Sequence, residues 1–257
     1  MESLNWHLKL FNKSILKQNK YNAIVALLDN TSSKTGLDIG ADNGVISYLL
    51  RLKGGQWYSA DLEQKAIDSI RSLVQTRVEK IDGEKTPFDS NFFDVVIIID
   101  FLEHIHTDGL FIQELHRILK KDGILIINVP HIKSFSIIRP LRLALGLTNE
   151  KHGHVRPGYT LKSLEQLISP YFQMTQSKTY SRFFTELLDT AIQWLTSRDQ
   201  TGASSKGVLI DQDDFQKIAK KFKMFSMLYP FFWLWTQLDK FIFFTQGYSL
   251  IVKAYKK

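Results

Sequence analysis

The sequence contains no cysteine, which excludes disulfide bonds, thiolate metal sites and a cysteine nucleophile. It also contains no uninterrupted apolar run of the about 20 residues that a bilayer-spanning helix needs. The opening segment, MESLNWHLKLFNKS, lacks the apolar core of a secretory signal. From these absences we expect a cytoplasmic protein.

The composition is that of an ordinary globular chain, since 44% of the 257 residues are hydrophobic and 23% are charged. This length suits one large domain, or a domain with an appendage. The net charge of +7 favours anionic partners, which include nucleic acid, anionic lipid and phosphorylated substrates. Charge alone does not choose among them.

Short apolar runs alternate with helical patterns through the first half of the chain. We expect strands at residues 35–39, 57–60, 77–81, 94–99 and 124–129. Between the last two, residues 110–119 place apolar side chains at spacings of three and four, and we expect that helix to end in the basic turn KKDG, residues 120–123. Strands alternating with helices predict right-handed βαβ units and a parallel sheet.

The turn after the first expected strand reads GLDIGADNG. Gly40 permits close approach of a ligand to the backbone, and Gly44 opens the next helix. A dinucleotide loop would need a further glycine where Asp42 stands, and this acid would repel a pyrophosphate. Asp61 ends the second strand, where it can accept hydrogen bonds from ribose hydroxyls. Adenosine with a positively charged, amino-acid-like tail fits this pattern, which describes S-adenosylmethionine.

Four segments in order carry a family resemblance: LDIGADNG, SADLE, IDGEKTPFDSNFFDVVIIIDFLEHI and LHRILKKDGILIINVPH. Over about residues 35–180 the chain resembles the class I S-adenosylmethionine-dependent methyltransferases, especially the broad subgroup that often acts on small or lipid-linked acceptors. The resemblance implies an α/β, Rossmann-like sheet of seven strands with helices on both faces. It also implies S-adenosylmethionine as the methyl donor.

The resemblance assigns expected roles position by position. Asp38, Gly40 and Gly44 match the loop around the methionine part of the donor, and Asp61 matches the ribose-binding acid. Asp82 and Gly83 match the segment beside adenine, and we expect Leu62 to cover one adenine face. Asp100 matches the end of the fourth strand, near the reacting centre, whereas Asp42 departs from the glycine usual in the family.

Three histidines are candidates for a general base. Methyl transfer is an in-line displacement, and a hydroxyl acceptor benefits from a base with a pKa near the working pH. His104 follows the fourth strand, His131 follows the fifth, and His154 lies before a helix that we expect to begin at Thr160; each could instead only pack or orient a loop. We favour His154 or His131, and we expect no metal. Arg156 is a candidate for binding an acceptor phosphate or carboxylate.

The chain carries an insert that the basic fold does not need. Residues 171–180 suit a sixth strand and residues 248–257 the last one, with a flexible, loop-like stretch at 198–208 between them. Residues 224–238 are uncharged and rich in Phe and Trp, and Gln237, Asp239 and Lys240 supply a polar face only near their end. The flanking lysines are Lys220, Lys221, Lys223 and Lys240. Such an insert suits an anionic membrane surface; an aromatic core or a dimer interface is the alternative.

We therefore expect three parts: a helical segment at 1–34, a methyltransferase core at 35–180 plus 246–257, and a helical insert at 181–245 that serves as a lid or membrane-surface element. The expected function is O-methylation of a glycan, lipid-linked or isoprenoid-like acceptor, with the protein peripheral at the inner face of the membrane. One alternative is a nucleic-acid methyltransferase, although DFLE follows the fourth strand instead of an Asn-Pro-Pro-aromatic motif. The other is a non-catalytic membrane-associated binding module.

Overall fold

The computed structural model describes residues 2–147, 154–197 and 212–257. Its centre is a seven-stranded sheet in the order β3-β2-β1-β4-β5-β7-β6, and β7 runs antiparallel to both of its neighbours. The strands are β1 Thr35–Ile39, β2 Gln56–Asp61, β3 Val78–Lys80, β4 Phe93–Ile99, β5 Leu119–Pro130, β6 Phe172–Tyr180 and β7 Ser249–Lys256. The expected class I methyltransferase sheet is confirmed.

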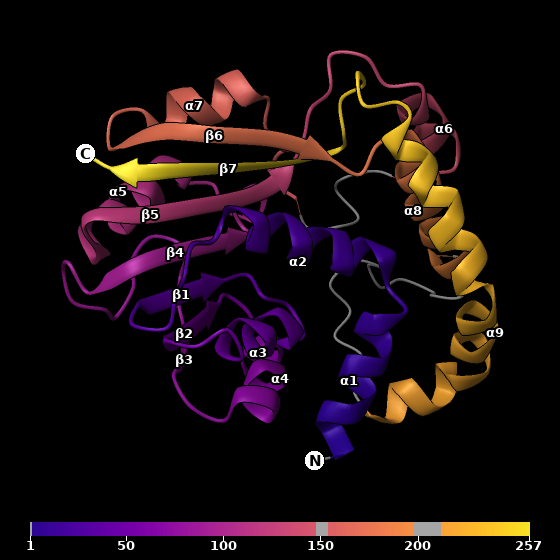
Figure 1. The fold of residues 1–257 in the computed structure, drawn as a ribbon, viewed down its shortest axis with the longest axis horizontal. Helices are drawn as coiled ribbons and strands as arrows, with labels where there is room; N and C mark the ends of the chain where they lie inside the picture. Colours follow the sequence, from indigo (N-terminus) through magenta and orange to yellow (C-terminus); the bar gives the residue numbers. More distant parts are fainter. Residues whose placement is uncertain (1, 148–153, 198–211) are drawn as a thin grey trace.

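Helices cover both faces of this sheet (Figure 1). They are α1 Glu2–Asn12, α2 Ile15–Leu27, α3 Val45–Arg51, α4 Gln64–Val74, α5 Asp108–Ile118, α6 Ile138–Ala144, α7 Leu161–Ile168, α8 Phe183–Ser197 and α9 Gln212–Gln237, with the short 3₁₀ helices η1 Leu102–His104 and η3 Leu238–Lys240. Helix α7 begins at the expected cap, where the Thr160 hydroxyl accepts a hydrogen bond from the Ser163 amide at 3.0 Å.

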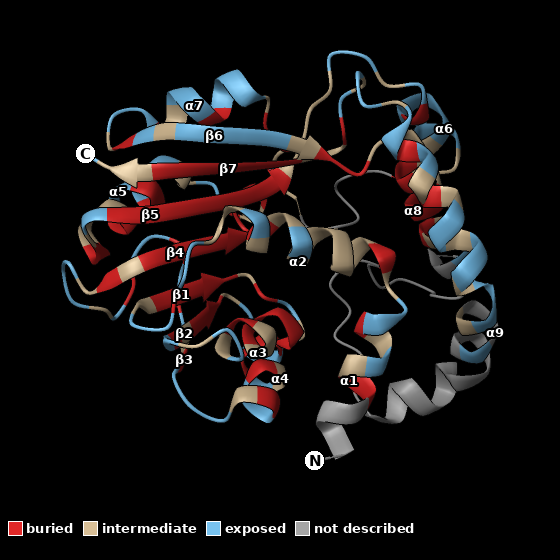
Figure 2. Cartoon of the chain, viewed as in Figure 1, coloured by how far each residue is buried: buried red, intermediate tan, exposed pale blue. Residues whose placement is uncertain are grey.

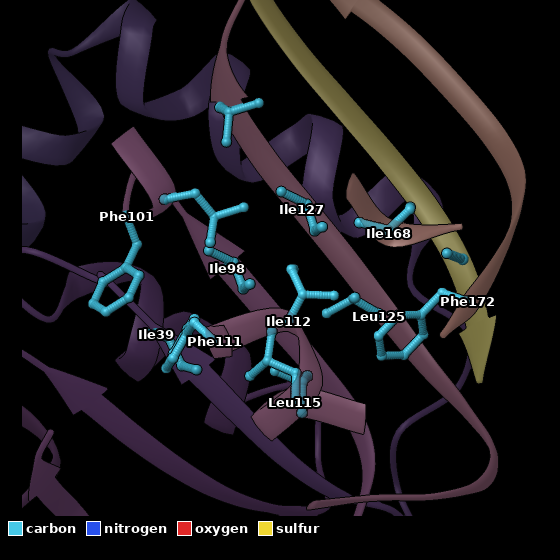
Figure 3. Packing of buried hydrophobic residues seen from close by; sticks show 14 of the residues in the cluster. Ile39, Ile98, Phe101, Phe111, Ile112, Leu115, Leu125, Ile127, Ile168 and Phe172 are labelled. Carbon is cyan, nitrogen blue, oxygen red and sulfur yellow. The ribbon is translucent and has the colours of Figure 1, made fainter. Parts of the chain in front are cut away.

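The core lies on both sides of β4, whose side chains alternate between two hydrophobic clusters. Val96 and Ile98 point into the cluster under α5 and α7, while Val95 and Ile97 point into the cluster under α2 and α3. Figure 3 shows Ile98 of the first cluster among side chains of α5, β5 and α7. The central strands β1, β4, β5 and β7 are red along most of their length in Figure 2 because both of their faces are buried, whereas the edge strand β6 is mostly pale blue. This burial explains the continuous apolar run of residues 95–99.

The strand order reverses between β1 and β4, which are parallel neighbours. In sheets of this kind, ligands bind beyond the carboxyl ends of the strands at such a reversal. The carboxyl ends of β1, β4 and β5 point toward the side where α8 and α9 stand, and α2 crosses in front of them (Figure 1). The N-terminal helices and the insert therefore both border the edge where a ligand is expected.

One expected boundary is wrong. Helix α5 ends at Ile118, and the KKDG turn belongs to the start of β5 instead of the end of the helix. The reason is tertiary: the Lys120 ammonium contacts the Asp94 carboxylate at 2.9 Å, and Lys256 of β7 donates to the Leu119 carbonyl at 2.7 Å. These contacts fix the segment beside β4 despite its helix-stop composition.

The insert holds α8 and α9 between β6 and β7, and the two helices contact each other. One face of α9 is packed, since the Trp235 ring meets the Phe184 ring edge-on at 5.1 Å. Asp239 does not face solvent as expected: it is buried, and its carboxylate caps α8 by accepting from the amides of Arg182 and Phe184 at 2.8 Å each. Asp239, at the polar end of the uncharged stretch, therefore caps a helix of the same chain.

Within the described ranges, no helix combines the length and the apolar character that a membrane crossing needs. The loop expected at 198–208 lies outside the described residues, as do the side chains of Lys220 and Lys221. The division into residues 1–34, the core and the 181–245 insert stays a prediction.

Candidate active site

The glycine turn after β1 has the backbone shape that the sequence suggests. Gly40 and Gly44 both have a φ of +80°, in the left-handed region that favours glycine. A Cβ on Gly40 would lie 2.3 Å from the Ile99 carbonyl oxygen, so β1 and β4 approach closely there. Gly44 is the N-cap residue of α3 and directs the amide end of that helix to the same edge.

Asp38 stands beneath this turn and is fully buried. Its two carboxylate oxygens accept hydrogen bonds from the hydroxyls of Ser47 at 2.5 Å and Ser59 at 2.9 Å, and Arg51 lies 3.7 Å away. Burial raises the pKa of Asp38, although Arg51 and the two hydroxyls oppose that rise. Because protein groups occupy both oxygens, Asp38 is placed to shape the turn from within.

Asp61 ends β2 with a mostly buried carboxylate, and its Oδ1 accepts from the Glu63 amide at 3.2 Å. Burial raises its pKa to about 6, and the backbone hydrogen bonds oppose this only in part. A carboxylate held this way favours partners that donate hydrogen bonds to it, as ribose hydroxyls do.

The expected adenine segment lies beside Asp61. A Cβ on Gly83 would meet Ile105 at 2.8 Å and Leu62 at 3.4 Å, which places these two apolar side chains on either side of the Gly83 backbone. Asp82 is exposed, and its Oδ1 accepts from the Glu84 and Lys85 amides at 2.8 Å each. These bonds lower the pKa of Asp82 and fix the turn around Gly83.

The carboxyl edge of the sheet, where the methyl donor is expected, is called the donor edge below. Two acids at this edge pair with lysines of α2, and these contacts were not predicted from the sequence. The Lys17 ammonium lies 3.0 Å from Asp42, and Lys20 pairs with Asp100. Asp42 and Asp100 have φ values of 55° and 45°, which explains why the family prefers glycine where Asp42 stands. The pairs join residues far apart in the chain, so no local pattern could have revealed them.

Asp100 continues into a buried hydrogen-bond chain. Its Oδ1 accepts from the Asn128 amide group at 2.7 Å, and the Tyr180 hydroxyl donates to Asn128 Oδ1 at 2.5 Å. Burial raises the pKa of Tyr180, which keeps its hydroxyl protonated as the donor. The chain fixes the position of Asp100 from the side of β5 and β6.

His104 and His154 are brought together, with their rings perpendicular and their centroids 4.8 Å apart. Glu103 lies beside them and is buried, and ligand atoms of the three residues lie within 4.8 Å of one another. Among the described residues, this is the group whose side chains could hold a metal ion. The expectation that the protein binds no metal ion stays a prediction.

His131 sits elsewhere, at the end of β5 beside β7. Its Nδ1 lies 2.8 Å from the Gly247 carbonyl oxygen, which requires Nδ1 to carry the proton and leaves Nε2 as an acceptor. Burial lowers the pKa of His131, Lys133 lowers it further, and the hydrogen bond to Gly247 opposes both. The ring is therefore neutral near pH 7, as a general base requires.

Arg156 makes several contacts within the protein. Its guanidinium pairs with Asp108 and donates to the Ile105 carbonyl at 2.8 Å and the His106 carbonyl at 3.1 Å. The Tyr159 hydroxyl donates to the same Asp108 carboxylate at 2.7 Å. These contacts hold the loop that carries His154, and binding of an acceptor phosphate or carboxylate by Arg156 stays a prediction.

The residues at this edge fit S-adenosylmethionine. The buried Asp61 carboxylate suits two ribose hydroxyls, and the left-handed Gly40 turn lets a ligand approach the backbone. The donor also carries an ammonium, a sulfonium and a carboxylate, and the edge offers both the acids Asp42 and Asp100 and the lysines paired with them. This is a charge pattern for a zwitterionic cation and not for a pyrophosphate.

Comparisons with known proteins agree with this geometry. A family described as a methyltransferase domain matches residues 37–127. The chain is 24% identical over 110 residues to a ubiquinone biosynthesis O-methyltransferase of Nitrosomonas europaea, a match covering 40% of this chain and 47% of that protein. It is 32% identical over 92 residues to human arginine-hydroxylase NDUFAF5, mitochondrial, covering 35% of this chain and 27% of that one. The match thus spans less than half the length of these two relatives.

The fold has solved counterparts as well. Phosphoethanolamine N-methyltransferase 2 of Haemonchus contortus, solved in complex with S-adenosyl-L-methionine, superposes with a TM-score of 0.55 at 15% identity, over 93% of this chain and 52% of that one. At this identity the likeness concerns the fold. The sheet order and the family match agree: residues 37–127 match a methyltransferase domain, the whole sheet has the class I methyltransferase order, and the methyl donor of this family is S-adenosylmethionine.

Proposed function

We propose that this protein transfers a methyl group from S-adenosylmethionine to an oxygen atom of an isoprenoid-like or lipid-linked acceptor at a membrane surface. The observation that carries the proposal is an exposed apolar surface on the helices beyond the carboxyl edge of the sheet. The relative named a ubiquinone biosynthesis O-methyltransferase supports oxygen as the methylated atom. In this account residues 181–245 form the insert that presents the acceptor to residues 35–180.

This apolar surface is built from three neighbouring segments. The first runs through α6 and the residues just before it, the second is the outer face of α9, and the third follows η3. Its exposed members are Phe135, Ile137, Leu141, Leu143, Met227, Leu228, Phe231, Trp233, Leu234, Phe241, Phe243 and Phe244. Helix α8 contacts both α6 and α9, and the Ser134 amide donates to Gln246 Oε1 at 3.1 Å. Phe231, Phe241 and Phe244 expose 62%, 76% and 76% of their surface, so large rings face outward in the part of the chain that the structure describes.

The charges around this surface favour an anionic bilayer. Arg139 and Lys240 are exposed beside its apolar members, while Asp239 is buried in the cap of α8. Cations flanking exposed aromatic rings match anionic headgroups above an apolar interior. A second copy of the chain placed symmetrically on this face would instead bring like charges together. We therefore propose a peripheral position at the inner face of the membrane.

The chemistry divides between donor and protein. Bound S-adenosylmethionine supplies an electrophilic methyl carbon whose transfer leaves a neutral thioether. Asp61 would hold the ribose of the bound donor, and the turn at Gly40 and Gly44 would hold its methionine part, so that these residues would orient the methyl group toward the acceptor. His131 accepts the acceptor hydroxyl proton at Nε2, because the Gly247 carbonyl holds its Nδ1 proton. Asp100 lines the reacting edge.

Methyl transfer to a lipid tests this proposal directly. Labelled S-adenosylmethionine is incubated with the protein and a cell extract, and the label is partitioned among lipid, aqueous and nucleic-acid fractions. We expect enzyme-dependent label in the lipid fraction. Label in nucleic acid would favour a nucleic-acid methyltransferase, and label in no fraction despite donor binding would favour a non-catalytic module.

Liposome sedimentation tests the membrane partner separately. We expect the protein to sediment with anionic vesicles, Trp233 to shift its fluorescence to the blue, and added salt to weaken binding at about 1 kcal/mol per cation near the surface. The double variant Phe231→Ser and Phe243→Ser should stay in the supernatant. Leu52→Ser, which removes an apolar side chain that is 66% exposed on another part of the molecule, is the matched control. A stable dimer that ignores vesicles would make this surface a dimer interface.

A further inference from the structure

A carboxylate and two imidazoles converge at the donor edge, where the short helix η1 meets the segment before α7. Glu103 and His104 belong to η1, which follows β4, and His154 comes from the segment before α7. The ligand atoms of the three side chains lie within 4.8 Å of one another, although His154 is far from the other two in the chain. Two imidazoles with one carboxylate are a donor set typical of divalent transition-metal ions.

Burial distinguishes this group from the acidic clusters that are common on protein surfaces. Only 1% of the Glu103 surface is exposed, and His104 and His154 are both half-buried. A buried carboxylate is unfavourable unless it is paired or coordinates a metal. A divalent ion would compensate the Glu103 charge, and it would bind the lone pairs of two neutral imidazole rings.

Contacts within the protein hold the two contributing segments together. The Val155 amide, next to His154, donates to the Glu103 carbonyl at 2.9 Å. The Arg156 guanidinium donates to the Ile105 carbonyl at 2.8 Å. Supporting contacts of this kind orient the ligands of metal sites. The three side chains are therefore brought together by the fold around them.

We propose, against the expectation drawn from the sequence, that Glu103, His104 and His154 bind a divalent transition-metal ion. Zinc takes nitrogen and oxygen ligands at about 2.0–2.2 Å in a tetrahedral arrangement, so two ligand atoms on one ion lie about 3.3–3.6 Å apart. The separation of at most 4.8 Å closes to this value with side-chain movements of about 1 Å. Imidazole ligands favour Zn²⁺ over Mg²⁺, which prefers oxygen.

The position of the site suggests what the ion does. Three protein ligands leave one position of a tetrahedral ion open to water or to an oxygen of the acceptor. The segment that carries His154 continues to Tyr159, which forms a β-bridge with His131, the candidate base. The open position therefore lies at the edge of the sheet where the acceptor oxygen is expected. This role rests on the proposed function, whereas metal binding itself does not.

Calorimetric titration with Zn²⁺ alone tests the site in the full chain after treatment with a chelator. We expect one Zn²⁺ per chain. His104→Gln and His154→Gln should each weaken binding by about a hundredfold or more, since loss of a supporting contact alone costs about 10–100-fold. Mass spectrometry of metal content after dialysis measures the same loss independently.

Matched variants control for adventitious zinc and for folding. His106→Gln removes an exposed imidazole close by in the same loop and should bind Zn²⁺ like the wild type. S-adenosylhomocysteine, the demethylated donor, should still bind His104→Gln, which shows that this variant is folded. No Zn²⁺ binding by the wild type, or equal binding by the His104, His106 and His154 variants, overturns the site. If the wild type binds Zn²⁺ but not S-adenosylhomocysteine, the metal site stands and the proposed function fails.

Discussion

Tyr229 of α9 donates a hydrogen bond to Gln18 of α2 at 3.2 Å, although 211 positions separate them in the chain. This contact links the insert to the helix whose lysines meet the donor edge. Removing it should loosen α2 without touching the pocket itself.

We therefore predict that Tyr229→Ala weakens binding of S-adenosylhomocysteine by about twofold to tenfold, the equivalent of one ordinary hydrogen bond. Tyr229→Phe keeps the ring against Lys13 and should lose less. Calorimetry on both variants, with 5′-methylthioadenosine as the second ligand, checks the result. Unchanged affinity in a folded Tyr229→Ala protein would mean that α2 holds its position without the insert.

The ribose contact gives a second prediction. Asp61→Ala should weaken donor binding by about 1.5–3 kcal/mol, because both ribose hydroxyls lose their charged acceptor. Asp68→Ala, on the exposed side of α4, removes an equal charge nearby and should have no effect. Equal affinities for the wild type and a folded Asp61→Ala protein, measured by calorimetry, would remove Asp61 from the site.

The raised pKa of Asp61 predicts the pH dependence of donor binding. The carboxylate is protonated below about 6 and ionised above it, and the ribose hydroxyls favour the ionised form. Below about 6, binding must release a proton, so affinity should fall by up to about tenfold for each pH unit of acidification. Above that pH it should be level. Calorimetry in buffers of different ionisation enthalpy detects the proton, and Asp61→Asn should abolish this dependence.

His131 as general base predicts how turnover depends on pH. Because burial lowers its pKa, the rate should rise with pH through one ionisation below the ordinary histidine value of about 6.5 and then stay level. His131→Ala should lose on the order of 10²-fold or more in turnover while keeping its donor affinity. His104→Ala and His154→Ala serve as comparisons. If all three variants turn over like the wild type, then either Asp100 is the base or proximity alone suffices.

The sheet was predictable because its strands are short apolar runs between glycine turns and amphipathic helices. Residues 95–99 are apolar throughout because β4 is buried on both faces. The start of β5 was not predictable: KKDG has the composition of a helix end, and only the contacts of Lys120 with Asp94 and of Lys256 with Leu119 make it a strand. A local sequence pattern does not predict the secondary structure of a segment whose conformation depends on contacts with residues far away in the chain.

The same distinction holds in the candidate site. Asp61 and Gly40 stand at strand ends that the sequence marks, so their places could be read from the motif order. The contact between Lys20 and Asp100 spans 80 positions, and nothing in the composition of α2 indicates it. Asp239 likewise looked like part of a solvent-facing end, yet the amides of α8 draw it inward.

The central claim is that the protein methylates a lipid acceptor that reaches the site through the apolar surface. One measurement tests methyl transfer to lipid and the role of this surface together. Labelled methyl incorporated into membrane lipid is compared between the wild type and the Phe231→Ser, Phe243→Ser double variant, at saturating S-adenosylmethionine. Both side chains are exposed and are not among the residues assigned to the donor, so donor affinity should stay the same. We predict that lipid labelling falls by about tenfold or more, because the apolar contact with the bilayer is lost. Equal labelling by the two proteins, or label confined to water-soluble products, would contradict the account.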